Sequence, residues 1–268
     1  MTAPWQQLPG SLRVELHDVV AVLRLHREHK RNALDDATVL GIESFFASPP
    51  PGVRVVVLDA VGRHFCAGLD LSELTERTTM QGLEHSLMWH RAFDRVERGS
   101  LPVVAALKGA VVGGGLELAT AAHIRVADAT TFYALPEGQR GLFVGGGGSV
   151  RVPRLIGAHR MADMMLTGRV YDADEGQSVG LSHYRVPEGA ALDRALTIAA
   201  TMAANSPVTN FAVLQALPRI AAANPAEGYL LESLMAAVAG GSTDAKERMR
   251  AFLDGRGPKV AGRTEGQQ

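Results

Sequence analysis

The amino-acid sequence predicts an α/β fold, with a strand-rich α/β core followed by a helical C-terminal region. Three observations support this prediction. Short apolar runs of strand type occur in the N-terminal half, apolar residues at helical spacing dominate after Ser149, and glycine or proline residues separate the runs. A chain of 268 residues is long enough for one or two domains. We expect the core to span residues 1–195 and the helical region to span residues 196–268.

The first elements are expected to be a β-hairpin and a helix. Residues 12–16 and 19–25 alternate apolar and polar side chains on either side of a polar turn, which is typical of paired antiparallel strands. Asp35 or Asp36 can cap the following helix, because a carboxylate at this position accepts a hydrogen bond from a free amide of the first turn. The helix is expected to end before the proline run at residues 49–51.

The rest of the core alternates between buried strands and helices. Residues 53–59 (VRVVVLD) are rich in β-branched side chains, which indicates a buried strand. The later elements of the core are expected, in chain order, at residues 82–98 (helix), 102–107 (strand), 116–122 (helix) and 123–127 (strand). Repeated strand–strand–helix units fit this order better than a strict alternation of one strand and one helix.

Helical spacing dominates the C-terminal part. Helices are expected at residues 160–166, 173–179, 190–204, 208–222, 226–239 and 244–253, with one short strand at residues 184–186. Residues 195–218 are uncharged and long enough to span a bilayer, but Asn205, Pro207 and Asn210 interrupt them. We therefore expect two helices of a soluble protein, split near Pro207, rather than a membrane span.

Composition restricts the classes of function. The 27 Lys and Arg residues nearly balance the 28 Asp and Glu residues, and the net charge of −1 argues against a nucleic-acid-binding protein. Cys66 is the one cysteine, so an internal disulfide and a cysteine-based zinc site are excluded. Residues 1–10 lack the basic start and apolar core of a signal peptide. These features predict a cytoplasmic protein that binds neither nucleic acid nor a membrane.

Glycine is concentrated in one stretch of the chain. Ten of the 29 glycines lie between Gly109 and Gly148, which indicates sharp turns or backbone that approaches a ligand closely. The glycines at residues 113–115 follow a strand and precede a helix. The first amides of that helix have no internal partner, so they can stabilise negative charge on a ligand oxygen. The alternative is that these glycines only permit tight packing.

Two glutamates stand beside glycine-rich turns. Glu117 lies about one turn inside the predicted helix, and Glu137 lies in a Leu-Pro-Glu-Gly turn ahead of four glycines at residues 145–148. Two such carboxyl groups suit general acid–base work on one substrate. The alternatives are a water-exposed acid near a helix N-terminus for Glu117 and an ordinary turn for Glu137. A loop with small residues at 62–71 is a third candidate segment, with a plain strand-to-helix connection as its alternative.

These segments, in this order, resemble the crotonase (enoyl-CoA hydratase/isomerase) superfamily. Further landmarks of the likeness, which covers residues 12–258, lie at residues 30–34 (KRNAL), 154–157, 165–168, 173–176 and 252–256. The resemblance implies a spiral of ββα units with a helical C-terminal region that mediates trimerisation, and trimers that can pair into hexamers. It also implies an acyl-coenzyme A thioester as the substrate, with no separate cofactor and no metal.

The resemblance also implies roles for individual residues. By position, the backbone amides of Ala67 and Gly114 match the oxyanion hole, which holds the thioester carbonyl oxygen. Glu117 would activate a water for attack at C3 of a trans-2-enoyl-CoA, and Glu137 would deliver a proton to C2. The positions that match substrate contacts are Ala67, Gly68, Leu69, Asp70 and Gly114. The implied activity is that of an enoyl-CoA hydratase, a lyase of fatty acid metabolism.

Other interpretations stay open at the level of sequence. Residues 141–144 (GLFV) depart from the proline-containing form of typical hydratases, in a segment that helps to shape the acyl pocket. His85 and His90 lie where some hydrolytic or dehalogenating relatives use a histidine, and His64 lies close to Ala67; packing or surface roles are the alternatives. The alternatives to hydration are isomerisation, thioester hydrolysis, retro-aldol cleavage and non-catalytic acyl-CoA binding.

Overall fold

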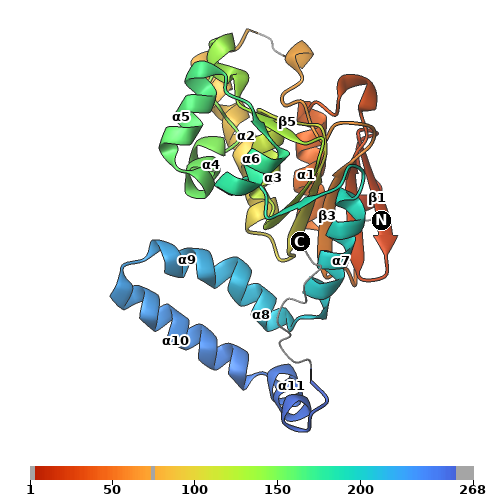
Figure 1. Ribbon diagram of the computed structural model, residues 1–268, viewed down its shortest axis with the longest axis vertical. Coiled ribbons are helices and arrows are strands. Elements are labelled where there is room, and N and C mark those ends of the chain that lie inside the picture. The colour runs from red at the N-terminus through yellow and green to blue at the C-terminus, as the bar shows by residue number, and fades with distance from the viewer. Residues whose placement is uncertain (1–3, 74–75, 258–268) are drawn as a thin grey trace. The chain divides into compact units, whose positions relative to one another are not determined.

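The computed structural model describes residues 4–73 and 76–257 of the chain (Figure 1). Contacts between its elements divide the chain into two units, of which the first ends at Ala204 and the second begins at Asn205. Helix α7 (Ala191–Ala204) belongs to the first unit and runs through the predicted boundary at residues 195/196. The extents predicted for the two regions stay a prediction.

The first unit contains a mixed sheet with the strand order β1-β2-β3-β4-β6-β9. Its strands are β1 (Leu12–His17), β2 (Val20–Leu25), β3 (Val55–Ala60), β4 (Val103–Leu107), β6 (Ile124–Asp128) and β9 (Tyr184–Val186). β1 and β2 pair antiparallel through a turn in which Asp18 has a φ of 53°, and the later neighbours in the sheet pair parallel. The predicted hairpin and core strands are therefore confirmed, with small differences at their ends.

Helix α7 covers one face of this sheet with a row of alanines. Ala191, Ala195, Ala199 and Ala203 recur every four residues and are all buried, so they lie on one side of the helix. They share a hydrophobic cluster with valines that point to this face from β2, β3, β4 and β6. The small alanine side chains let the helix lie close to the branched side chains of the sheet.

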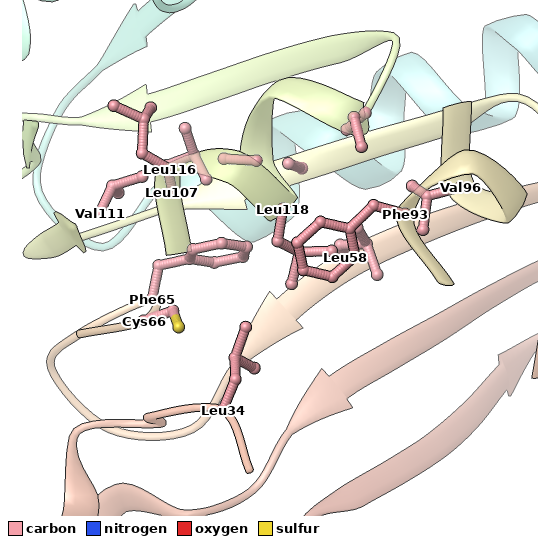
Figure 2. Close-up of a cluster of buried hydrophobic side chains, with 14 of the residues drawn as sticks. Leu34, Leu58, Phe65, Cys66, Phe93, Val96, Leu107, Val111, Leu116 and Leu118 are labelled. Carbon is pink, nitrogen blue, oxygen red and sulfur yellow. The ribbon is translucent and has the colours of Figure 1, made fainter. Parts of the chain in front are cut away.

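The opposite face of the sheet carries larger side chains and is covered by other helices. These are α1 (Asp36–Ala47), α2 (Thr79–Glu97) and α3 (Gly114–Ala121). Figure 2 shows Phe93 and Val96 of α2 gathered with Leu58 of β3 and Leu118 of α3. Full burial of side chains of this size stabilises the fold by about 1.5–3 kcal/mol each, so this cluster holds the helices on the sheet.

Side-chain caps define where α1 and α2 begin. The Asp35 carboxylate accepts a hydrogen bond from the Thr38 amide at 2.8 Å, which confirms one of the two predicted caps. Thr78 and Gln81 form a reciprocal capping box at the start of α2. Because this box precedes the expected start at residue 82, α2 is longer at its N-terminus than the apolar spacing indicates.

A second, smaller sheet is not predicted by the sequence. In it, β5 (Ala110–Val112) pairs parallel with β7 (Phe132–Ala134), and β7 pairs antiparallel with β8 (Tyr171–Asp172). Strands this short cannot display an alternating pattern. The parallel pairing places the ends of β5 and β7 side by side, and the Gly113 amide donates to the Ala134 carbonyl oxygen at 3.0 Å. The glycine turn and the Glu137 turn therefore leave the same edge.

The first unit contains further helices. They are α4 (Gly148–Ile156), α5 (Ala158–Thr167) and α6 (Ala173–Val179), with the 3₁₀ helices η1 (Pro4–Gln6), η2 (Glu28–Lys30), η3 (Leu71–Glu73) and η4 (Pro136–Arg140). The helices α5 and α6 confirm the predictions at residues 160–166 and 173–179. α4 begins at Gly148 and contains Pro153. Because glycine and proline have low helix propensity, the local sequence does not predict this helix.

The second unit is helical, as expected. It comprises α8 (Pro207–Phe211), the π-helix η5 (Ala212–Ala216), α9 (Leu217–Ala222), α10 (Pro225–Gly241) and α11 (Thr243–Leu253). α7 ends at Ala204 and α8 begins at Pro207, which confirms the break expected there. α10 packs against α9. Within the described part of the chain, no helix combines the length and apolar character needed to cross a membrane.

Candidate active site

A cavity of about 380 Å³ in the first unit brings together most of the predicted site residues. Its lining comes from the segment after β3, from α2, from the start of α3 and from η4 with the loop that follows it. The predicted residues that line it are Ala67, Gly68, Leu69, Gly114, Glu117 and Glu137. Asp70 is not part of the lining. An apolar cavity with a few convergent polar groups is the usual form of a small-molecule site.

Asp70 anchors the segment that lines the cavity. Its carboxylate accepts hydrogen bonds from the Ser72 hydroxyl at 2.7 Å and from Arg27 Nη2 at 2.8 Å. These bonds, above all the one from Ser72, hold the pKa of Asp70 well below its usual range. This buried side chain thus fixes the loop to the N-terminal part of the unit and does not line the cavity.

The backbone amides after β3 face different partners. The Ala67 amide donates to the Arg31 carbonyl oxygen at 3.0 Å, and the Asp70 amide donates to the Leu34 carbonyl oxygen at 2.8 Å. Across residues 4–73 and 76–257, no group accepts a hydrogen bond from the Leu69 amide. Leu69 forms a parallel bridge with Leu34, so its neighbours bond to Leu34 while its own amide turns to the other side.

Leu69, rather than Ala67, therefore offers the unpaired amide at the cavity, and the prediction for the Ala67 amide is wrong because that amide is already bonded. A Cβ atom built on Gly114 would lie 3.5 Å from the Leu69 nitrogen, and one built on Gly68 would lie 3.4 Å from the Gly114 nitrogen. The Leu69 and Gly114 amides thus lie close together. Gly114 is the first residue of α3, where the amide lacks an intrahelical partner and the helix dipole is positive.

Gly115 lies in the tightest part of this turn. A Cβ atom on it would lie 2.5 Å from the Cys66 carbonyl oxygen, within the buried region that Figure 2 shows around Cys66 and Leu116. We expect Gly115→Ala to lower the free energy of unfolding by about 1–3 kcal/mol, because backbone atoms cannot move aside cheaply. Urea unfolding followed by circular dichroism measures this change.

Gly240→Ala is the matched control for that substitution. Gly240 lies within α10, and a Cβ atom on it would have nothing within 4 Å. Alanine in an open helical position raises stability by about 0.5–1 kcal/mol relative to glycine. A Gly115→Ala protein as stable as the Gly240→Ala protein would contradict the close contact at Cys66.

Glu117 is a buried carboxyl group held by the backbone of the next glycine cluster. Its Oε1 atom accepts hydrogen bonds from the Gly146 and Gly148 amides, both at 2.7 Å, and the residue is only 3% exposed. Burial raises the pKa of Glu117, whereas the two amides and the charge of Arg151 act in the opposite direction. The alternative of a water-exposed acid at a helix N-terminus is therefore wrong.

Glu137 offers a second carboxyl group to the same cavity. It lies in η4, and a Cβ atom on Gly113 would lie 2.6 Å from its Oε1 atom, so a side chain at residue 113 would require the Glu137 carboxyl group to move. Its Oε2 atom is buried and has no hydrogen-bond partner in the described structure. Burial is the main cause that raises the pKa of Glu137, and the negative charge of Glu117 raises it further. The two predicted acids thus share one cavity and interact electrostatically.

Large apolar side chains form another part of the cavity wall. Trp89 of α2 is buried, and a Cβ atom on Gly114 would lie 2.8 Å from its indole ring. Leu142, Phe143 and Val144 line the cavity from the segment after η4. Trp89 is not among the predicted site residues. Its burial is indicated by its apolar spacing with Phe93 on α2, and the Phe93 ring contacts the indole edge-on.

The histidines divide between the cavity and its surroundings. His85 lines the cavity, and its Nε2 atom lies 2.7 Å from Asp36 Oδ1. His64 and His90 are not part of the lining, and His64 Nδ1 accepts a hydrogen bond from the Ala110 amide at 3.1 Å. Burial raises the pKa of the Cys66 thiol to about 12, so it packs as a neutral side chain. In the described residues no group of three His, Cys, Asp or Glu side chains is placed to hold a metal ion.

Curated relatives match nearly the whole chain. A 2,3-dehydroadipyl-CoA hydratase of Escherichia coli is 30% identical, over 95% of this chain and 100% of the relative. The enoyl-CoA hydratase EchA19 of Mycobacterium tuberculosis is 29% identical, over 93% of this chain and 96% of the relative. These relatives are therefore similar to this chain over nearly its full length.

Solved structures give the same result. A crystal structure of a Rhodopseudomonas palustris protein is 57% identical with a TM-score of 0.90, over 92% of this chain and 95% of that one. An enoyl-CoA hydratase of Bacillus anthracis is 29% identical with a TM-score of 0.86, over 94% of this chain and 100% of that one. Residues 15–263 also match the enoyl-CoA hydratase/isomerase family as a whole. The chain therefore belongs to the enoyl-CoA hydratase/isomerase family.

Proposed function

We propose that this protein is an enoyl-CoA hydratase, which adds water across the 2,3 double bond of a trans-2-enoyl-CoA thioester. The observation that carries the proposal is the meeting of two carboxyl groups, the buried Glu117 and the half-buried Glu137, with the Leu69 and Gly114 amides, which have no acceptor among the described residues, at one cavity. The names of the similar hydratases support the same activity.

In the proposed reaction, the thioester carbonyl oxygen accepts hydrogen bonds from the Leu69 and Gly114 amides, which stabilise the negative charge that develops on it. The Glu117 carboxylate takes a proton from water while the water oxygen forms a bond to C3. The electrons of the double bond move into an enolate, and Glu137 then donates a proton to C2. The product is a 3-hydroxyacyl-CoA, and no electrons leave the substrate, so the reaction needs no redox cofactor.

The direct test is an assay of purified protein with a panel of CoA thioesters that includes crotonyl-CoA. Formation of 3-hydroxybutyryl-CoA, identified by mass spectrometry, supports hydration. Free CoA as the main product would favour thioester hydrolysis instead, a candidate to which the contact of His85 with Asp36 at the cavity gives structural support. Shifted double bonds or chain cleavage would indicate isomerisation or retro-aldol chemistry, and tight binding without turnover would indicate a non-catalytic member.

The pH dependence of the reaction is expected to reflect both acids. Activity requires Glu117 to be ionised and Glu137 to be protonated, so kcat/KM rises with the first ionisation and falls with the second. Because burial raises the pKa of both groups, both limbs of the profile should lie above the ordinary glutamate value of about 4.3. A pH series of kcat/KM with crotonyl-CoA measures the limbs, and an acid limb at or below that value would contradict the assignment.

We further propose that the protein is cytoplasmic and assembles as a homotrimer or as a pair of trimers. The second unit exposes many large apolar side chains, which is unusual for an isolated soluble surface. They include Phe211, Leu217, Tyr229, Leu230, Leu234, Val238 and Leu253. Sedimentation equilibrium of the full chain distinguishes a monomer, a trimer and a hexamer by mass.

A further inference from the structure

The loop that holds Glu117 is itself held from behind by an arginine. Arg151 of α4 is only 8% exposed, and its Nη1 atom donates to the Gly146 carbonyl oxygen at 2.8 Å. Its Nε atom donates to Glu97 Oε2 at 2.7 Å, at the last residue of α2. The guanidinium group therefore connects α2 to the loop whose amides bind Glu117.

This connection matters because the backbone of the loop has unusual conformational freedom. Residues 145–148 are four consecutive glycines, and glycine has the largest backbone freedom of any residue. Gly146 accepts from Arg151 through its carbonyl oxygen and donates to Glu117 through its amide. Gly147 has a φ of 97° and lies against the Arg151 guanidinium group, so a side chain there would displace it. Arg151 therefore holds this loop together with Ser86 of α2, whose Oγ atom donates to the Gly145 carbonyl oxygen at 2.7 Å.

We infer that Arg151 is a positioning residue, which aims the Gly146 and Gly148 amides at Glu117 Oε1 and keeps Glu117 in the ionised form that a general base requires. The inference rests on the proposed hydratase function. It assigns the two acids different roles through their surroundings, because Arg151 and the start of α4 favour a negative charge on Glu117 alone.

The other charged groups near Glu117 agree with this division. Glu97 of α2 is paired with Arg151 and offsets part of its charge. Burial and the charge of Arg151 lower the pKa of His90 of α2, so this histidine adds no positive charge at neutral pH. On the side of η4, the charge of Glu117 raises the pKa of Glu137, and Arg140 opposes that effect only in part. Arg151 and the two amides therefore offset part of the effect of burial on the pKa of Glu117, whereas the charge of Glu117 adds to the effect of burial on the pKa of Glu137.

The kinetic test compares Arg151→Gln and Arg151→Lys with Arg154→Gln. Arg154 lies on the exposed side of α4, so its substitution removes the same charge from the same helix. We expect Arg151→Gln to lower kcat about tenfold near neutral pH and to move the acid limb of the profile up by about one pH unit, with KM changed by less than about threefold. Arg151→Lys keeps the charge and should restore the limb, and Arg154→Gln should match the unsubstituted protein. Equal profiles for all the proteins would overturn the inference.

A titration without substrate separates this inference from the proposed function. The Glu117 carboxyl carbon is followed by ¹³C NMR in protein labelled at glutamate side chains, and its signal is assigned by its loss in Glu117→Gln. We expect Arg151→Gln to raise the titration midpoint of Glu117 and Arg151→Lys to leave it near its original value. Unchanged midpoints in both variants would overturn the role of Arg151 even if hydration is observed. Absence of turnover in the unsubstituted protein, with the expected midpoint shift, would instead overturn only the hydratase assignment.

Discussion

Replacing Glu117 by glutamine is expected to lower kcat for the hydration of crotonyl-CoA by about 10²- to 10⁴-fold, the usual contribution of general acid–base catalysis. The glutamine carbonyl oxygen can still accept hydrogen bonds from Gly146 and Gly148, so the loop should keep its position. The amide cannot take a proton from water, and only the chemical step is lost. Steady-state kinetics, with butyryl-CoA binding measured by calorimetry, separates turnover from affinity.

Glu137→Gln should produce a loss of similar size for the opposite reason, since the amide cannot donate a proton to C2 as an acid does. Glu188→Gln is the matched control, because Glu188 is exposed and does not line the cavity. Its kcat and KM should stay within about twofold of the unsubstituted protein, as for most surface substitutions. Normal turnover in either the Glu117 or the Glu137 variant would remove the two-acid mechanism.

Deleting the Leu69 amide is expected to give the second large loss of activity. An ester bond in place of the peptide N–H, introduced at residue 69 as a 2-hydroxy acid by nonsense suppression, leaves the side chain unchanged. Loss of one oxyanion donor lowers kcat by about 10²- to 10³-fold in other enzymes. Because no group in the described structure accepts a hydrogen bond from the Leu69 amide, the folded state loses little when it is deleted. Kinetics and thermal unfolding on the same sample test both statements.

The same replacement at residue 67 should behave differently. The Ala67 amide donates to the Arg31 carbonyl oxygen, so its deletion removes an internal hydrogen bond that contributes about 0.5–1.5 kcal/mol to stability. Catalysis should change by only a few fold. If the ester at residue 67 abolishes hydration while the ester at residue 69 does not, the donor is Ala67 and the assignment to Leu69 fails.

Most elements that the sequence predicts well have enough residues to show a period, although the three-residue strand β9 is also predicted. β2 and β3 are long apolar strands, and the alanine row of α7 repeats over the whole helix, so local spacing reveals them. β5, β7 and β8 form only because distant segments pair, and their few residues carry no pattern. α4 starts among glycines, where propensity opposes a helix and tertiary contacts decide.

The site shows the same difference between features visible in the local sequence and features that depend on tertiary contacts. The glycine clusters and the two glutamates are visible in the sequence, because a turn beside an acid is a local pattern. The hydrogen bonds from Gly146 and Gly148 to Glu117 join residues about 30 positions apart along the chain. The local sequence does not reveal the roles of Trp89 and Arg151, since aromatic and arginine residues are common in helices.

The sequence by itself determined the class of fold, the acids Glu117 and Glu137, and the two glycine-rich turns, because these depend on residue type and local order. Only the tertiary structure decided which amide is unpaired. The parallel bridge between Leu34 and Leu69 turns the Leu69 amide toward the cavity, while the Ala67 amide is bonded to Arg31. The direction of an amide depends on which strand lies alongside. Every residue type except proline carries the same N–H group, so the side chain does not indicate that direction.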